Sequence, residues 1–261
     1  MRNFHFPGRS PVLASNGMCA TSHPLAAKVA IDTLERGGNA MDAAIAGAVI
    51  LGLCEPQMTG IGGDCFALFN TPGTDDVLGY NGSGRAPAGI SSDALRAAGH
   101  NTIPVNAPEA VTIPGAIDAF CRLSESLGKL GIDALLAPSI HYAKEGIPVA
   151  PRVAYDWPGD AESLSGHAIT HYSKAGQPFG VGDVFRAPGQ AEVLHRVAKH
   201  GRDAFYTGEV ADDMISALRE HGGVHRQDDF ASTKGTPTEP VSGHYKGMEL
   251  LEHPPNGQGA A

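Results

Sequence analysis

The sequence has little positive charge. It contains 19 lysines and arginines against 28 aspartates and glutamates, and its formal net charge is −9 at pH 7. A nucleic-acid-binding protein needs a basic surface for phosphates, and a membrane-surface protein of the polybasic type needs clustered lysines. We therefore expect no nucleic acid and no membrane among the partners of this chain.

Long apolar runs are also missing. The longest lies near residues 43–54, whereas a helix that crosses a bilayer needs about 20 apolar residues. The first ten residues contain no apolar segment typical of a signal peptide. These two absences predict a soluble, cytoplasmic protein.

Cysteine is scarce, and its spacing is uninformative. No C-x-x-C pair occurs among the four cysteines, which are Cys19, Cys54, Cys65 and Cys121. Reduced, buried thiols are therefore favoured over disulfides or a metal site. The twelve histidines are scattered, and no cysteine or glutamate accompanies them at ligand spacing. We expect no metal and no cofactor.

Familiar catalytic motifs are absent as well: there is no G-x-S-x-G elbow, no Walker A loop and no H-E-x-x-H. The glycines of residues 60–63 raise phosphate binding as an alternative. Their spacing does not fit a dinucleotide fingerprint, and a predicted strand follows them instead of a helix, so a structural turn is favoured.

What the chain does have is a regular pattern of apolar segments and turns. One helix is predicted with Ser22 as its cap and His23-Pro24 in its first turn, ending at Gly37-Gly38. A second is predicted over residues 40–53, where Asn39 is the cap of a run of alanines. Further helices are predicted at about residues 91–98, 115–127, 133–145, 151–164, 188–199 and 210–221. Residues 165–187 are predicted to form a loop or lid.

Strands are predicted at residues 64–70 and 77–81, as an antiparallel hairpin, and at 241–245 and 248–251 around a Lys246-Gly247 turn. Both faces of the 64–70 strand are apolar, so we expect it to be covered on both sides. The order of helices and strands predicts an α/β, layered α+β protein. Residues 1–16 are interpreted as an irregular arm and residues 17–261 as one domain.

One arginine, Arg85, is a candidate ligand-binding residue. Arg85 follows a tight turn of small residues, Asn81-Gly-Ser-Gly84, which would let a ligand approach the backbone. A guanidinium holds a carboxylate through two parallel hydrogen bonds. An ordinary surface arginine is the alternative at this stage.

Several motifs, taken in order, resemble those of γ-glutamyltransferases, which are N-terminal-nucleophile hydrolases. They occur at residues 37–44 (GGNAMDAA), 55–63 (EPQMTGIGG), 113–115 (IPG), 136–138 (LAP), 143–149 (AKEGIPV), 205–209 (FYTGE) and 254–259 (PPNGQG). This resemblance covers nearly the whole chain from about residue 17. It corresponds to the large-subunit portion of the family's domain, incomplete at its C-terminus.

The resemblance implies a four-layer αββα fold, made as a precursor that cleaves itself. It implies that a threonine at the new N-terminus of the small subunit is the nucleophile, with its own α-amine as general base. That threonine is expected downstream of Ala261, because Thr21, Thr59 and Thr112 do not lie in the family's self-cleavage motif. Arg85 matches the arginine that binds the substrate's α-carboxylate.

The resemblance leaves the substrate open. Asp64 and the form of residues 81–87 differ from the exported glutathione-degrading members and look closer to a cytoplasmic branch that includes oxamate amidohydrolase. We expect a γ-glutamyltransferase or glutathione hydrolase that passes a γ-glutamyl group to water or an amine, with the small subunit as partner. The alternatives are an amidohydrolase for a small acid amide such as oxamate, and a non-catalytic fragment or subunit.

Overall fold

Each of the first two helices begins at a capping residue whose side chain accepts a hydrogen bond from a backbone N–H group of the first turn. In the computed structural model, which describes residues 11–161, 164–257 and 259, α1 spans Pro24–Glu35 and α2 spans Ala40–Cys54. The His23 side chain accepts a hydrogen bond from the N–H of Leu25 at 3.2 Å. The predicted cap, Ser22, is therefore wrong: His23 is the cap, and the Ser22 hydroxyl donates to Glu55 at 2.6 Å instead.

The apolar helix α2 lies at the centre of the helical part. It packs against α1, α4 (Ala116–Leu127) and α5 (Ile132–Glu145). Asn39 and Asp42 form a capping box at its start, which confirms the predicted cap. Its alanines and Gly47 permit close packing: a Cβ on Gly47 would lie only 3.5 Å from the Cβ of Ala30.

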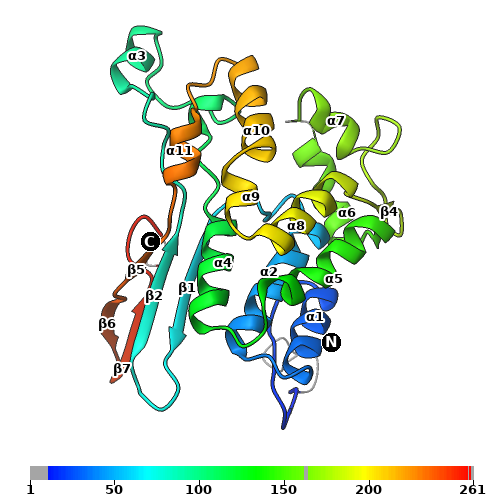
Figure 1. Cartoon of the computed structure of the whole chain (residues 1–261), viewed down its shortest axis with the longest axis vertical. Helices are drawn as coiled ribbons and strands as arrows, with labels where there is room; N and C mark the ends of the chain where they lie inside the picture. Colours follow the sequence, from blue (N-terminus) through cyan, green and yellow to red (C-terminus); the bar gives the residue numbers. More distant parts are fainter. Residues whose placement is uncertain (1–10, 162–163, 258, 260–261) are drawn as a thin grey trace, which may run out of the picture.

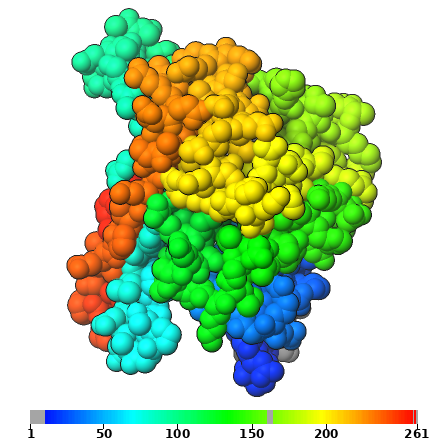
Figure 2. All heavy atoms as spheres, viewed as in Figure 1, coloured from blue at the N-terminus to red at the C-terminus, as the bar shows by residue number. Residues whose placement is uncertain are grey.

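The remaining helical segments of the described chain are α3 (Ser92–Ala97), a 3-10 turn at Pro108–Ala110, α6 (Pro151–Ala161), α7 (His167–His171), α8 (Pro188–His200), α9 (Asp203–Tyr206), α10 (Glu209–Glu220) and α11 (Gln227–Ser232). In the view of Figure 1, α3, α11 and α10 lie above the sheet, and α6, α7 and α8 lie to the right. None of the residues of α3 is buried, and this segment projects from the rest of the molecule (Figure 2).

A three-stranded antiparallel sheet, in the order β1-β2-β5, lies beside the helices (Figure 1). β1 (Cys65–Asn70) and β2 (Val77–Gly82) form the predicted hairpin, with Cys65 opposite Gly82. β5 (Thr236–Thr238) pairs with the other edge of β2, so that Thr236 lies opposite Asn81. This pairing brings the end of the chain back to the end of β2.

A second hairpin, β6 (Val241–Tyr245) and β7 (Met248–Glu252), confirms the predicted turn at Lys246-Gly247, where both residues have positive φ. The predicted loop over residues 165–187 is wrong in part. It contains α7 and the strand β4 (Val184–Phe185), which pairs with β3 (Ile147–Pro148). Regular structure forms here because Phe179 and Phe185 pack against Trp157 in the core.

The prediction that β1 is covered on both sides is wrong for the described chain. α4 packs against β1 and β2 on one face. On the other face Phe66 is 41% exposed and Leu68 is 38% exposed, and Phe66 meets only the edge of the His253 ring among aromatic neighbours in the described residues. The sheet therefore has one buried apolar face and one open apolar face.

The α/β class predicted from the sequence is confirmed. Residues 11–16 of the predicted arm contain no helix or strand, while residues 1–10 lie outside the described residues. No helix in the described part of the chain is long and apolar enough to span a membrane.

Candidate functional site

Three segments that are distant in the sequence meet at the end of β2. The carbonyl oxygen of Gly63 accepts hydrogen bonds from the backbone N–H groups of Gly115 and Ala116, both at 3.0 Å. The N–H of Ile113 donates to the carbonyl oxygen of Arg85 at 2.9 Å. These bonds fix the backbone on which Arg85 stands and anchor it to the start of α4.

The contact between these segments is so close that it requires glycine. A Cβ on Gly84 would lie 1.5 Å from the carbonyl oxygen of Ile113, and one on Gly115 would lie 2.1 Å from that of Gly82. No side chain fits at such distances. The contacts also favour a structural turn at residues 60–63, since Gly63 offers a carbonyl oxygen here and its N–H is bonded to Gly60 at 3.1 Å.

A chain of polar contacts runs across this turn. Asp64 accepts a hydrogen bond from the N–H of Gly84 at 2.8 Å and one from the hydroxyl of Ser83 at 3.3 Å. The amide of Asn256 donates to the Ser83 hydroxyl at 2.7 Å, and its oxygen accepts from the amide of Asn81 at 3.0 Å. The C-terminal motif and the Arg85 turn are thus joined side chain to side chain.

A cavity of about 340 Å³ opens at this junction. Its lining residues are Asn81, Ser83, Gly84, Arg85, Ala86, Lys234, Thr236 and Asn256. The side chains of Arg85 and Lys234 are exposed and form no hydrogen bond or salt bridge with any described residue. Among the described residues no carboxylate belongs to the lining, and Arg85 and Lys234 bring two positive charges that attract an anion.

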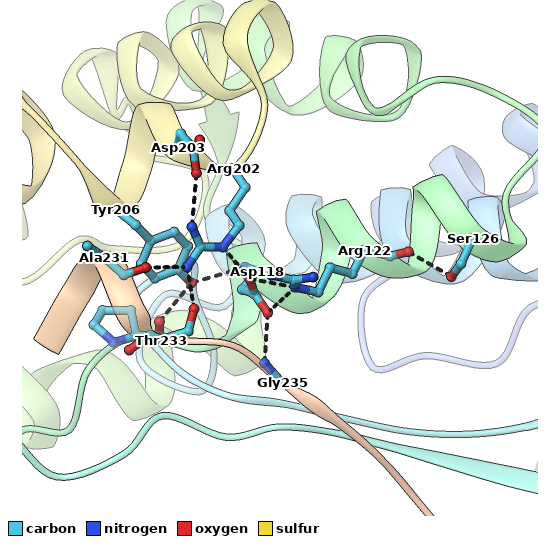
Figure 3. A network of polar contacts seen from close by, with 10 residues as sticks. Asp118, Arg122, Ser126, Arg202, Asp203, Tyr206, Ala231, Thr233 and Gly235 are labelled. Carbon is cyan, nitrogen blue, oxygen red and sulfur yellow. Dashed lines mark hydrogen bonds and ion pairs between the residues drawn. The ribbon is translucent and has the colours of Figure 1, made fainter. Parts of the chain in front are cut away.

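The segment that carries Lys234 is held by a buried carboxylate (Figure 3). Asp118, on α4, is fully buried and accepts a hydrogen bond from the N–H of Gly235 at 2.8 Å. Its carboxylate also accepts from Arg122 at 2.9 Å and from Arg202. A buried carboxylate is stable only with such partners.

Arg202 connects this carboxylate to the chain just before Lys234. Its guanidinium donates to the carbonyl oxygens of Thr233 and of Ala231, the latter at 3.3 Å, and to Asp203 at 2.9 Å. It also lies 4.4 Å from the centre of the Tyr206 ring, where a cation is attracted by the ring face. Every part of this guanidinium is engaged, and only 16% of the side chain is exposed.

Tyr206 is a further member of this network and connects it to the segment before α4. Its hydroxyl donates to the carbonyl oxygen of Pro114 at 2.7 Å and accepts from the N–H of Asp118 at 3.0 Å. Burial raises the pKa of the Tyr206 phenol, so it stays a donor. The residue therefore ties α9 to the segment that holds the Arg85 turn.

The comparisons with known proteins identify the family. The sequence matches the family model "Gamma-glutamyltranspeptidase" over residues 26–261. That range includes all three segments of the site. The chain belongs to the γ-glutamyltranspeptidase family.

The family's solved structures share the fold. The chain superposes on a cephalosporin acylase from Bacillus halodurans with a TM-score of 0.90 and 39% identity, covering 97% of this chain and 49% of that chain. For the Helicobacter pylori γ-glutamyltranspeptidase the TM-score is 0.88 at 25% identity, with 94% and 72% covered.

Among curated relatives of this γ-glutamyltranspeptidase-family chain is the glutathione hydrolase-like YwrD proenzyme of Bacillus subtilis. The two are 33% identical over 251 residues, which is 95% of this chain and 47% of the relative. The chain thus spans about half the length of the curated relatives it matches. What it shares with them is the large-subunit region.

The structure places the predicted site residue, Arg85, in the cavity wall. Thr21, Thr59 and Thr112 are not among the cavity's lining residues. Sequence reasoning missed Lys234 and the role of Asp118. Asn256 lies in a motif that signalled the family, but nothing in the sequence indicated its contact with Ser83.

None of the four cysteines forms a disulfide. The prediction that all four are buried is wrong, because only Cys54 is buried and the other three are half-buried. Burial raises the pKa of the Cys54 and Cys121 thiols to about 12 and that of Cys65 to about 11. Such thiols stay protonated near neutral pH and are poor nucleophiles.

Proposed function

We propose that this protein is a glutathione hydrolase-type enzyme that cleaves γ-glutamyl amides, and that Arg85 binds the α-carboxylate of the γ-glutamyl group. The observation that carries the proposal is an arginine with no described partner in the wall of a cavity. The 254–259 motif contributes Asn256 to the lining of this cavity, and the 113–115 motif bonds to the backbone of Arg85. A fixed backbone and an unpaired guanidinium are what a carboxylate site needs.

In the proposed reaction the nucleophile is a threonine hydroxyl from a second subunit of the same precursor. Its oxygen attacks the amide carbon and the C–N bond breaks, while the threonine α-amine passes the proton to the leaving amine. Water or another amine then attacks the acyl-enzyme and releases the threonine. The part of this chain is to bind and orient the acyl group.

Two observations support a second subunit. The matched relatives are described as proenzymes, and this chain spans about half their length. The open face of the sheet and its neighbouring hairpin expose large apolar side chains, a feature typical of an interface. They are Phe66 and Leu68 on the sheet and Tyr245, Met248 and Leu250 on the hairpin. We propose that strands of the small subunit cover this face and complete the four-layer sandwich.

A second candidate is hydrolysis of a small acid amide such as oxamate, which also carries a carboxylate beside its amide. The described lining residues favour it in one respect: they include no carboxylate to receive the α-ammonium group of a γ-glutamyl substrate. A protein that is 39% identical to this chain is described as a cephalosporin acylase, a name that does not refer to a γ-glutamyl substrate, which also supports this candidate.

The test is hydrolysis of γ-glutamyl-p-nitroanilide by the natural full-length protein, compared with ammonia release from oxamate. We expect Arg85→Ala to lower kcat/KM for the γ-glutamyl substrate about 100-fold, the equivalent of ~2.7 kcal/mol for a charged, bidentate contact. The melting temperature should not change, because no described residue depends on the Arg85 side chain.

Arg96→Ala is the matched control. Arg96 is an exposed arginine on α3 whose only described ion pair is with Asp93 at 3.2 Å, so its loss should leave turnover unchanged. Turnover of oxamate alone would replace the first candidate by the second. Equal activity of wild type and Arg85→Ala would remove Arg85 from the site.

The third hypothesis, that these 261 residues alone are a non-catalytic fragment or subunit, is compatible with the proposed mechanism. It predicts no turnover of either substrate by the isolated chain. Turnover by that chain, abolished by Arg85→Ala, would contradict it. A cytoplasmic location is also proposed, in keeping with four cysteines that form no disulfide.

A further inference from the structure

The cavity holds a second cation that the proposed function does not use. Lys234 lines it together with Arg85, yet it comes from the segment before β5 and not from the Arg85 turn. It is exposed and has no acidic partner among the described residues. A lysine that only faces solvent does not require a fixed main chain. Whether the main chain at Lys234 is fixed therefore bears on its role.

Both neighbours of Lys234 are fixed by buried groups (Figure 3). The carbonyl oxygen of Thr233 accepts from Arg202, and the N–H of Gly235 donates to Asp118 at 2.8 Å. Gly235 is also pressed against β2, since a Cβ there would lie 2.6 Å from the Tyr80 ring. The main chain at Lys234 is therefore rigid, and the side chain starts from a defined point on the cavity wall.

No described residue forms an ion pair with Lys234 or with Arg85. Asp64 accepts hydrogen bonds from the N–H of Gly84 and the hydroxyl of Ser83, and it does not line the cavity. Two cations in one small cavity repel each other. A ligand with two anionic groups relieves this repulsion better than a ligand with one.

We propose that Lys234 is a second anion-binding residue of this site, which gives preference to amide substrates that carry a second carboxylate in addition to the one bound by Arg85. This inference rests on the proposed function, because it assigns Lys234 to the same substrate. For a γ-glutamyl amide the second carboxylate belongs to the leaving amine, as in a γ-glutamyl amino acid.

The test uses two substrates that differ in one charge, γ-glutamylglycine and γ-glutamylglycinamide, with the natural full-length protein. Wild type should prefer the acid. Lys234→Met should raise KM for γ-glutamylglycine about tenfold, while kcat for it and both constants for the amide change less than twofold. A KM effect is expected because a charge contact of this kind is made in the ground state and the transition state alike.

Three controls separate charge from structure. Lys234→Arg keeps the positive charge and should keep the preference for the acid. Lys144→Met removes the same charge from an exposed site at the end of α5 and should behave as wild type. Raising NaCl from 0.05 to 0.5 M should reduce the wild-type preference, since salt screens exposed charges, and should not affect Lys234→Met.

The outcomes distinguish the two proposals. If wild type cleaves both substrates and Lys234→Met affects both equally or neither, the role of Lys234 is overturned while the proposed function stands. If wild type cleaves neither substrate, the proposed function fails and the role of Lys234 fails with it. A loss confined to γ-glutamylglycine supports the inference.

Discussion

Arg202 and Arg85 are the same residue type in two opposite situations. Arg202 bonds to a buried carboxylate, to two carbonyl oxygens and to Asp203, and only 16% of its side chain is exposed. Arg85 is exposed, and the described residues offer its guanidinium no partner. The guanidinium of Arg202 is bonded within the fold, whereas that of Arg85 is available to bind a ligand.

The difference shows how the fold supports the site. The Asp118 network fixes Thr233 and Gly235 around Lys234, and the start of the same helix is bonded to the Gly63 turn. The paired charges of Asp118 and Arg202 in the interior thus position the unpaired charges of Lys234 and Arg85 at the surface. Changes to the first group should affect stability, whereas changes to the second should affect binding.

The largest effect on stability is expected from Asp118→Ala. It leaves Arg202 buried without its carboxylate and the N–H of Gly235 without an acceptor, which costs about 3–5 kcal/mol of unfolding free energy. The midpoint of urea unfolding measures it. Asp118→Asn, which keeps the shape and one acceptor oxygen, should lose less. A loss below about 1.5 kcal/mol for the alanine variant would mean that the network contributes little.

A smaller loss is expected from Tyr206→Phe. The change removes one oxygen atom and leaves the N–H of Asp118 and the carbonyl of Pro114 unsatisfied in the interior, at a cost of about 1–3 kcal/mol. The same unfolding experiment measures it. Tyr155→Phe is the control, because Tyr155 is 79% exposed. An unfolding midpoint equal to that of wild type would show that water replaces the phenol.

The smallest loss is expected from Arg122→Met. Arg122 bonds to the same carboxylate as Arg202, but 44% of its side chain is exposed, so solvent screens the pair. Asp118 also retains Arg202 and Gly235 as donors. We expect a loss of about 0.5 kcal/mol. A loss of unfolding free energy as large as that of Asp118→Ala would mean that the exposed Arg122, and not the less exposed Arg202, is the main stabilising partner of Asp118.

The sequence predicted the long elements well. α1, α2 and the β1–β2 hairpin have turns and apolar periods that act over a few residues, and these local signals are confirmed, as is the Asn39 cap of α2. The predicted Ser22 cap of α1 is not confirmed. α9 and α11 were missed, because four or six residues are too few to show a helical period. The open face of β1 was missed for another reason: the apolar pattern of a strand does not show whether the same chain covers both of its faces.

The site was predicted only in part. The resemblance to the family singled out Arg85, and the glycines around it suggested a close approach of backbone. Lys234 could not be found, because it becomes a cavity residue only when β5 pairs with β2 and brings it beside Asn81 and Asn256. Asp118 has the sequence surroundings of an ordinary helix residue, and its role depends on Arg202, which is distant in the chain.

The most direct test of the account is a crystal structure of the full-length protein with L-glutamate bound. The account predicts that the α-carboxylate oxygens lie about 2.7–3.1 Å from the guanidinium nitrogens of Arg85, with the Asp118–Arg202 contacts unchanged. A glutamate bound elsewhere, with the Arg85 side chain in solvent or paired with a protein carboxylate, would contradict it.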